Sequence, residues 1–485
     1  MRLKVNRLPL KIYPNNKRVI TRYFSHELIK SEFIINKVMS MSDEEAEINL
    51  TNVLREFAKR HRNITRIFEK NFATTVGSVK LSREKLEGLS QTKKLLIGSY
   101  FTMEYSIESA ALYNPSIVPH PNQSNLEEGQ KRIIISLRAT GESHISSIVF
   151  RSGIIDSTGN ITLDPQGNYI GEAEVIKGYA YDKKNFMNLM KEHNIKNDVS
   201  SEILDMLGNV FYYTQLKNAI SNVRKNRTLN LENERSVAKM LWLARSHYDL
   251  SFSQDTDISE RVIFPVSRTE SKGIEDARFV RFEEENGEFT YYATYTAFDG
   301  TTILPKIIET KDFYLFRNLP LHGECAKDKN FALFPKKINN KYAMLSRIDG
   351  MNQYIMLSDD ITLWESAFLL QKPEFPWEFV QVGNAGSPIE TDEGWLVLTH
   401  GVGPMRKYCL GIILLDLHKP QKLLARLKEP LIVPTEEERE GYVPNVVYSC
   451  GALLHNDLLI IPYSSSDYAT SFATIELKKV MGALD

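Results

Sequence analysis

Residues 279–295 read FVRFEEENGEFTYYATY and set the first expectation for the fold. Two runs rich in Phe and Tyr, as strands prefer, flank the pair Asn286-Gly287. Both positions of a tight hairpin turn need positive φ, which Asn and Gly tolerate. Similar turns stand at Asn339-Asn340, 392–394 and Asn456-Asp457, each between strand-like runs. The chain is therefore expected to fold mainly as antiparallel β-sheet.

The spacing of these turns bears on the architecture. They recur roughly every 50 to 60 residues, about the length of one four-stranded propeller blade. This spacing predicts a mainly β chain with a β-propeller over about residues 110–485, interrupted by a helical insertion at about 180–245. Periodicity alone also fits a β-sandwich.

Helical signals gather in segment 1–109 and in the insertion. Ser42 and Glu45 form a capping-box pattern, in which the serine hydroxyl accepts from a helical amide and the glutamate reaches back. Apolar residues recur behind it at helical spacing, and further helical stretches are expected at about 91–112 and 201–223. These segments fit either the acceptor side of a site or the interface of a homo-oligomer.

Bulk composition excludes several classes of function. Lys and Arg number 60 and Asp and Glu 61 in 485 residues, so no global field favours nucleic acid or an anionic membrane. No apolar run has the length of a signal peptide or a membrane span. Cys325, Cys409 and Cys450 are far apart and match no metal-ligand spacing. We therefore expect a cytoplasmic protein with reduced thiols and neither metal nor cofactor.

Five polar segments stand at the ends of strand-like runs or in the loops before them. In a propeller these ends converge on one axial face, so residues distant in sequence meet there. Trp395 is expected in the core, and His400 fits a structural role and a sugar ligand equally well. The candidate site residues are Asn114, Ser116, Arg138, Glu142, His144, Glu275, Asp276, Lys329, Asn330, Arg347, Glu390, His400 and Asp467.

Taken singly, these residues leave alternatives open. Neighbouring residues of an extended strand point to opposite sides, so only one of Glu275 and Asp276 is expected to face a given site. A capped turn with a surface ion pair is the alternative for both. The cations Arg138, Lys329 and Arg347 together suit sugar hydroxyls, phosphate or catalytic carboxylates, although each of them taken singly better fits an ordinary ion pair.

Taken together, the motifs resemble glycoside hydrolase family 130, the β-mannoside phosphorylases and mannosidases built on a five-bladed propeller. The similarity runs from about residue 110 to the C-terminal residue and leaves the insertion unmatched. The motifs that carry it, in order, are Gly-Ile-Glu-Asp276-Ala-Arg, Ala-Leu-Phe-Pro335, Glu-Gly-Trp395 followed by His400-Gly, and Val-Pro-Asn445-Val-Val.

The resemblance implies roles for single residues. In the family, the aspartate of the Glu-Asp-(Pro/Ala)-Arg motif is the proton donor, in some members through a substrate hydroxyl, and this implies that role for Asp276. Elements of the first blade and a late aspartate of the last blade hold the mannosyl unit. The residues expected to bind sugar are Asn114, Ser116, Arg138, His144, His400 and Asp467.

The phosphate positions bear on which reaction is expected. Family phosphorylases bind phosphate through a basic residue with Asn, a later Arg, and a Lys in Pro-Ile-Lys-Thr. This chain has Lys329-Asn330 and Arg347, but Glu390 stands in the last place. A carboxylate about 4 Å from phosphate, at an effective dielectric near 20, costs about 4 kcal/mol. Glu390 is therefore expected to help activate water or else to pair with Arg347, and Glu142 is the candidate second catalytic glutamate.

These positions predict an inverting β-mannosidase that acts on β-1,2-linked manno-oligosaccharides, with Asp276 as the acid. The first alternative is a β-mannoside phosphorylase, which takes inorganic phosphate and releases mannose 1-phosphate. Lys329 and Arg347 support that alternative. The second alternative is a propeller that binds sugar without turnover.

Overall fold

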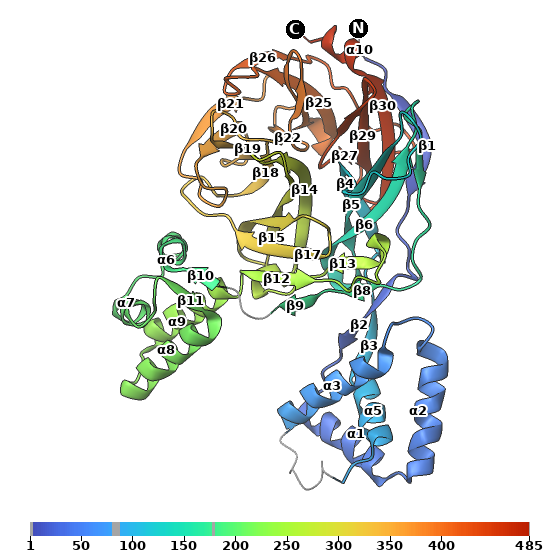
Figure 1. Cartoon of the computed structure of the whole chain (residues 1–485), viewed down its shortest axis with the longest axis vertical. Helices are drawn as coiled ribbons and strands as arrows, with labels where there is room; N and C mark the ends of the chain where they lie inside the picture. The colour runs from blue at the N-terminus through green and yellow to red at the C-terminus, as the bar shows by residue number, and fades with distance from the viewer. Residues whose placement is uncertain (1–2, 80–87, 177–179, 485) are drawn as a thin grey trace.

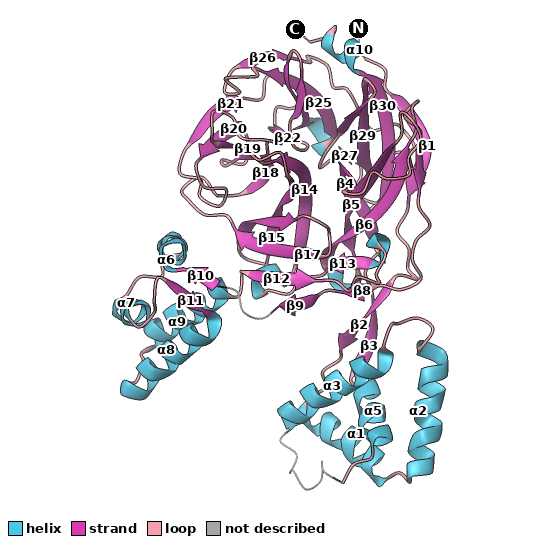
Figure 2. Cartoon of the chain, in the orientation of Figure 1, coloured by secondary structure: helices cyan, strands magenta, loops and turns pink. Residues whose placement is uncertain are grey.

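The computed structural model describes residues 3–79, 88–176 and 180–484. The chain is mainly β-structure, and its strands fill one large body from which two groups of helices project at the same end (Figures 1 and 2). Most ladders are antiparallel and join strands that are close in sequence. No helix in the described ranges is long and apolar enough to cross a membrane.

The segment 279–295 forms the hairpin that the sequence predicts, although its turn differs from the expected two-residue turn. Glu284 N donates to Glu288 O, so the connecting loop is longer by one residue and only Gly287 has positive φ, at 80°. This is the three-residue hairpin loop, in which a single position is left-handed. The hairpin belongs to a twelve-stranded sheet. From the hairpin onward its ladder runs through β14 (Gly273–Glu283), β15 (Phe289–Phe298), β16 (Ile303–Thr310), β17 (Leu315–Pro320), β12 (Tyr248–Ser251) and β9 (Glu174–Ile176).

Two separate sheets follow in sequence. Buried side chains pack between them, and Trp395 lies there as expected, 1% exposed with its ring centroid 5.2 Å from that of Phe334. The first sheet contains β18 (Lys329–Leu333), β19 (Tyr342–Arg347), β20 (Gln353–Ser358) and β21 (Ala367–Gln371). The second contains β22 (Gln381–Asn384), β23 (Ile389–Thr391), β24 (Gly394–Val402), β25 (Tyr408–Leu415) and β26 (Leu423–Arg426).

The first strand of the chain completes the last sheet, because β1 pairs with β30 and sets Asn6 opposite Thr474. Segment 1–109 is therefore not helical throughout. The last sheet contains β1 (Asn6–Ile12), β27 (Val447–Tyr448), β28 (Leu453–His455), β29 (Leu458–Ser465) and β30 (Ala469–Glu476), and α10 (Leu477–Met481) follows it. The other six strands of the sheet that holds β14 are β4 (Ala111–Pro119), β5 (Lys131–Thr140), β6 (Ser146–Ile155), β7 (Ile161–Leu163), β8 (Gly171–Glu172) and β13 (Arg261–Ile263).

The N-terminal helices form their own apolar core. The capping box is confirmed, since Ser42 Oγ accepts from Glu45 N at 3.1 Å and Glu45 Oε2 accepts from Ser42 N at 2.8 Å. The stretch expected at 91–112 ends early, because strand structure resumes at Thr102. The elements are α1 (Leu28–Ser40), α2 (Asp43–Phe57), α3 (Ile64–Val79) and α5 (Gln91–Tyr100), with β2 (Val19–Tyr23) and β3 (Thr102–Ser106) leading to the β body.

The insertion is a second helical unit with a separate core. The single stretch expected at 201–223 is two helices, and a short strand divides them. Its elements are β10 (Ala180–Asp182), α6 (Lys183–Glu192), α7 (Asp198–Asp205), β11 (Val210–Tyr212), α8 (Tyr213–Asn226) and α9 (Leu231–Ala244).

Candidate active site

Three strands shift register where the candidate residues stand. The shifts lie in β4, β14 and β18, and within each of them one residue has a left-handed backbone: Asn114 with φ 48°, Asp276 with φ 56° and Asn330 with φ 73°. Asn and Asp adopt this conformation more readily than most residues. Bulges turn side chains away from the regular alternation and occur often beside active sites. Three distant segments thereby direct polar side chains to one place.

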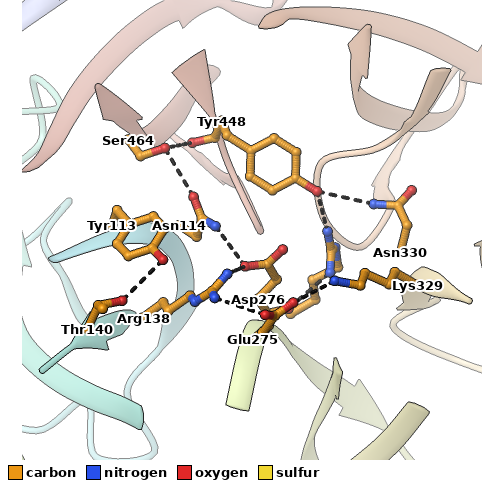
Figure 3. A network of polar contacts seen from close by, with 11 residues as sticks. Tyr113, Asn114, Arg138, Thr140, Glu275, Asp276, Lys329, Asn330, Tyr448 and Ser464 are labelled. Carbon is orange, nitrogen blue, oxygen red and sulfur yellow. Dashed lines mark hydrogen bonds and ion pairs between the residues drawn. The ribbon is translucent and has the colours of Figure 1, made fainter. Parts of the chain in front are cut away.

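The bulge in β14 overturns the expectation that only one of its two carboxylates faces the site. Asp276 Oδ1 accepts from Asn114 Nδ2 at 2.7 Å and from Arg138 Nη1 at 3.1 Å. Glu275 accepts from Arg138 Nη2 at 3.1 Å and from Lys329 Nζ at 2.7 Å. Figure 3 shows these five residues, here named the Asp276 cluster, with Arg138 and Lys329 approaching the carboxylates from opposite sides. Because Asp276 is left-handed, strand alternation fails at this point.

The cluster is largely desolvated yet open to a ligand, since its four charged side chains are between 15% and 33% exposed and Asn114 is buried. Burial raises the pKa of the Asp276 carboxyl, but the charges of Arg138 and Arg278 more than offset it, and the pKa lies below its usual value. Asp276 is therefore a carboxylate near neutral pH. It can donate a proton only after taking one from a bound group.

A second set of polar contacts lies behind the cluster. Arg278 donates to the carbonyl oxygen of Asp276 at 3.0 Å and to the Tyr448 hydroxyl at 2.6 Å. Asn330 Nδ2 donates to the same hydroxyl at 3.3 Å and to Asn384 O at 2.8 Å. The Tyr448 hydroxyl thus accepts twice and keeps its own proton to donate.

His400 belongs to this second set, and it is 1% exposed. Its Nδ1 lies 2.9 Å from Asn384 O, and its Nε2 lies 3.2 Å from Arg347 Nη1. A carbonyl accepts and a guanidinium donates, so Nδ1 carries the proton and the ring is neutral. Burial, and then the charge of Arg347, hold the pKa of His400 well below its usual value. His400 therefore orients Arg347, and the sugar-ligand alternative loses support.

Asp467 and Ser116 lie on the Arg138 side of the cluster. Burial raises the pKa of Asp467 to about 7, and the charges of Arg138 and Asp276 act on it in opposite directions. This carboxyl therefore exchanges its proton near neutral pH. Ser116 is fully buried, and its Oγ accepts from Phe279 N at 3.0 Å. Ser116 joins β4 to β14 and supports the site from behind.

Three hairpin turns share one backbone conformation at this end of the body. In each, two successive residues other than glycine have φ between 48° and 58°, and the flanking residues close the turn with a hydrogen bond of 3.1 to 3.3 Å. Such pairs belong to type I′ turns and cost free energy for most side chains. The pairs are Ser143 and His144, Met405 and Arg406, and Ser466 and Asp467.

Glu390 does not join the cluster, and this corrects the expected catalytic role. Glu390 Oε1 lies 2.7 Å from Lys336 Nζ, with the two side chains 42% and 41% exposed. Glu390 stands opposite Trp395, five positions before His400 on β24, which is about 16 Å along the strand. It therefore pairs with Lys336 instead of Arg347 and lies toward the other end of the strand from the site.

Glu142 is also set apart from the cluster. It lies in an exposed turn, and its carboxylate accepts from Ser106 N at 3.1 Å. His144, in the same turn, contacts the Tyr442 hydroxyl through Nδ1 at 2.8 Å. Neither contact leads to Asp276, so no second catalytic glutamate is evident among these candidates.

The sequence reasoning missed several residues of the site. Arg278 is the arginine of the recognised motif Gly-Ile-Glu-Asp276-Ala-Arg, and Tyr448 directly follows Val-Pro-Asn445-Val-Val, so the sequence contained a signal for both positions. Arg406 had no such signal, since only the folded turn brings its charge to act on Asp467. Within residues 3–79, 88–176 and 180–484, no group of three or more His, Cys, Asp or Glu side chains could hold a metal ion.

Comparison with known proteins gives the family. The sequence model described as β-1,4-mannooligosaccharide phosphorylase matches residues 230–485. A 1,2-β-oligomannan phosphorylase of Thermoanaerobacter sp. is 35% identical over 218 residues, 44% of this chain and 71% of the relative. A β-1,2-mannobiose phosphorylase of Listeria innocua is 29% identical over 252 residues, 50% of this chain and 68% of the relative.

Among solved structures, the complex of β-1,2-mannobiose phosphorylase from Listeria innocua with β-1,2-mannobiose is 20% identical, with a TM-score of 0.46 over 77% of this chain and 92% of that one. The matched family region, residues 230–485, is more than half of the chain and includes Asp276, Lys329 and Arg347. The chain therefore belongs to glycoside hydrolase family 130.

Proposed function

We propose that the chain is a β-mannoside phosphorylase, which cleaves a β-1,2-mannosidic bond with inorganic phosphate and releases mannose 1-phosphate. This replaces the hydrolase expected from Glu390, because a carboxylate paired with Lys336 away from the cluster gives no reason to exclude phosphate. The relatives named above are phosphorylases of mannosides, and this supports the proposal.

The observation that carries the proposal is the pairing of Lys329 with Arg347 across β18 and β19. Like charges in directly opposed positions destabilise a ladder. Glu275 neutralises Lys329, but Arg347 has no carboxylate partner in the described part of the chain, and the neutral His400 holds it. An unneutralised, half-buried guanidinium beside an ammonium group suits a bound oxyanion. The free Tyr448 hydroxyl proton offers a further donor to the same anion.

The mechanism follows from these positions. A phosphate oxygen held by Arg347 and Lys329 attacks the anomeric carbon of the mannosyl unit, and the bond to the leaving oxygen breaks on the opposite face with inversion. Asp276 is ionised before substrate binds, so it must first gain a proton, which the attacking dihydrogen phosphate supplies overall. Asp276 gives this proton to the substrate hydroxyl that it contacts, and that hydroxyl passes its own proton to the leaving oxygen. Asn114 and Arg138 keep the Asp276 carboxylate in place.

We also propose that the β body is a five-bladed propeller from about residue 110 to 485 with β1 added to its last blade. Each blade would be a four-stranded antiparallel group that begins with an inner strand, and the helical unit within 1–109 and the insertion near 180–245 would be attached units. The inner strands would be β4, β14, β18, β22 and β27. A cytoplasmic location remains a prediction from the sequence.

The test is incubation of the purified chain with β-1,2-mannobiose, with and without inorganic phosphate. We expect cleavage only with phosphate and mannose 1-phosphate as a product. Asp276→Asn should lower turnover by about 10²–10⁴-fold, the usual worth of proton transfer. Release of mannose without phosphate would restore the hydrolase, and affinity without turnover would favour the sugar-binding alternative.

A further inference from the structure

One aromatic residue near the cluster has no role in the proposed mechanism. Tyr442 precedes the recognised motif Val-Pro-Asn445 and is 45% exposed. Its hydroxyl lies 2.8 Å from His144 Nδ1, and the two rings are tilted by 32° with centroids 5.8 Å apart. His144 is exposed as well. Two adjoining aromatic rings therefore present uncovered surface to solvent.

The backbone holds Tyr442 between two of the three left-handed turns. Val443 N donates to Ser466 O at 2.9 Å, in the turn that carries Asp467. Gly441 packs so closely on that turn that a Cβ there would lie 2.7 Å from Ser466 Cβ. The hydroxyl of Tyr442 meanwhile contacts the turn that follows Arg138. Tyr442 thus bridges the two turns beside the charges of Arg138 and Asp467, which act on each other.

The stereochemistry of the proposed reaction indicates which of the two sugars lies beside Tyr442. Lys329 and Arg347 lie on β18 and β19, whereas Arg138 reaches the carboxylates from the opposite side (Figure 3). In an inverting displacement the nucleophile and the leaving group occupy opposite faces of the anomeric carbon. Phosphate on the Lys329 side therefore directs the leaving sugar toward the Arg138 side, where the bridge stands.

From this placement, and resting on the proposed function, we infer that Tyr442 binds the leaving-group sugar, with His144 positioning its ring. A tyrosine ring presents an apolar face to the C–H groups of a pyranose and buries area at low entropic cost. In the neutral imidazole the Tyr442 hydroxyl donates to Nδ1, so Nε2–H is left to donate to a sugar oxygen. Tyr442 and His144 thereby determine which sugar is preferred as the acceptor.

The experiment separates the two sugars by running the reaction in the synthetic direction. Tyr442→Ala should raise KM for the acceptor, mannose, by about 10-fold while KM for mannose 1-phosphate and kcat stay within about 2-fold, because uniform binding at one subsite is lost. Tyr442→Phe keeps the ring and should raise the acceptor KM by only about 2- to 3-fold. Tyr100→Ala, at a tyrosine that is also 45% exposed but lies on α5, is the matched control.

An acceptor KM within 2-fold of wild type in Tyr442→Ala would overturn the inference, as would equal rises in both KM values. If the wild type shows no turnover, the proposed function fails, and calorimetric titration with β-1,2-mannobiose and with mannose 1-phosphate still decides the role of Tyr442. Loss of disaccharide affinity in Tyr442→Ala, with the affinity for mannose 1-phosphate unchanged, supports it. Equal affinity in both proteins, or no binding by the wild type, refutes it.

Discussion

Arg138 offers the sharpest test of the cluster because one side chain neutralises two carboxylates. The side chains of Arg138, Glu275 and Asp276 are 18%, 15% and 19% exposed. Replacing Arg138 with Met keeps much of the volume and leaves both carboxylates with Lys329 as the remaining cation of the cluster. Breaking a buried ion pair costs about 3–5 kcal/mol. Partial exposure favours the lower value, about 3 kcal/mol.

The free energy converts to a melting shift through the unfolding entropy. At about 2.1 cal/mol/K per residue, a chain of 485 residues loses about 3 °C in Tm for 3 kcal/mol if it unfolds as one unit. Differential scanning calorimetry of wild type and Arg138→Met measures this at about pH 7. Arg317→Met is the control, since Arg317 is 52% exposed and lies 4.0 Å from Asp249. An exposed pair of this kind should shift Tm by about 0.5 °C or less.

The same prediction extends to the pH dependence of the Tm difference between wild type and Arg138→Met. The native pKa of Asp276 lies below its unfolded value, so its stabilising contribution is present above the unfolded pKa of about 3.9 and disappears as pH falls through the native pKa. The difference in Tm between wild type and Arg138→Met should therefore be full at about pH 7 and shrink below about pH 4. A variant within 1 °C of wild type at pH 7, or a difference that does not shrink in acid, would refute the reasoning.

Three further predictions follow from other positions. Glu390→Gln should leave turnover within about 2-fold and cost under about 1 kcal/mol in calorimetry, because its ion pair is exposed; a loss of orders of magnitude would return it to the site. The free energy of unfolding of Asp467→Asn should rise relative to that of wild type between about pH 4 and pH 7 and stay higher above pH 7, since burial raises the native pKa of Asp467 to about 7. Urea unfolding across this pH range measures the difference, and a difference that does not change with pH contradicts the prediction. Lys306→Met should cost about 3–5 kcal/mol in urea unfolding, because Lys306 and Glu270 are both fully buried and 2.6 Å apart, whereas Lys336→Met should cost under about 1 kcal/mol; equal losses would contradict the role of burial.

Local features were predictable because their causes are local. The hairpin at 286–287 and the capping box at Ser42 depend on a few neighbouring residues, and both are present. The ordered motifs indicated the family, and the five polar segments predicted that Asn114, Arg138, Asp276 and Lys329 belong to one site. The orientation of adjacent side chains was not predictable, since a bulge depends on the partner strand as well as on the strand that carries it.

The error at Glu390 has a related cause. A motif gives the residue type at a position, whereas the role of the residue depends on which end of a strand that position occupies. Glu390 and His400 belong to one short stretch of sequence, but the strand between them separates an exposed ion pair from a buried site. The pairing of β1 with β30 could not be predicted either, because the sequence of a strand does not specify which distant strand it pairs with.

That pairing has a consequence for the order of events on the ribosome. β1 leaves the ribosome long before its partner strand is made, because Asn6 stands opposite Thr474. At synthesis rates of about 5–20 residues per second, β1 waits about 20–90 s for its partner. The N-terminal helices between them in sequence have their own core and can fold during that wait. Closure of the last sheet is thus a late, long-range step, and a chain that stops before Ala469 leaves both β1 and β29 without the strand that pairs with them.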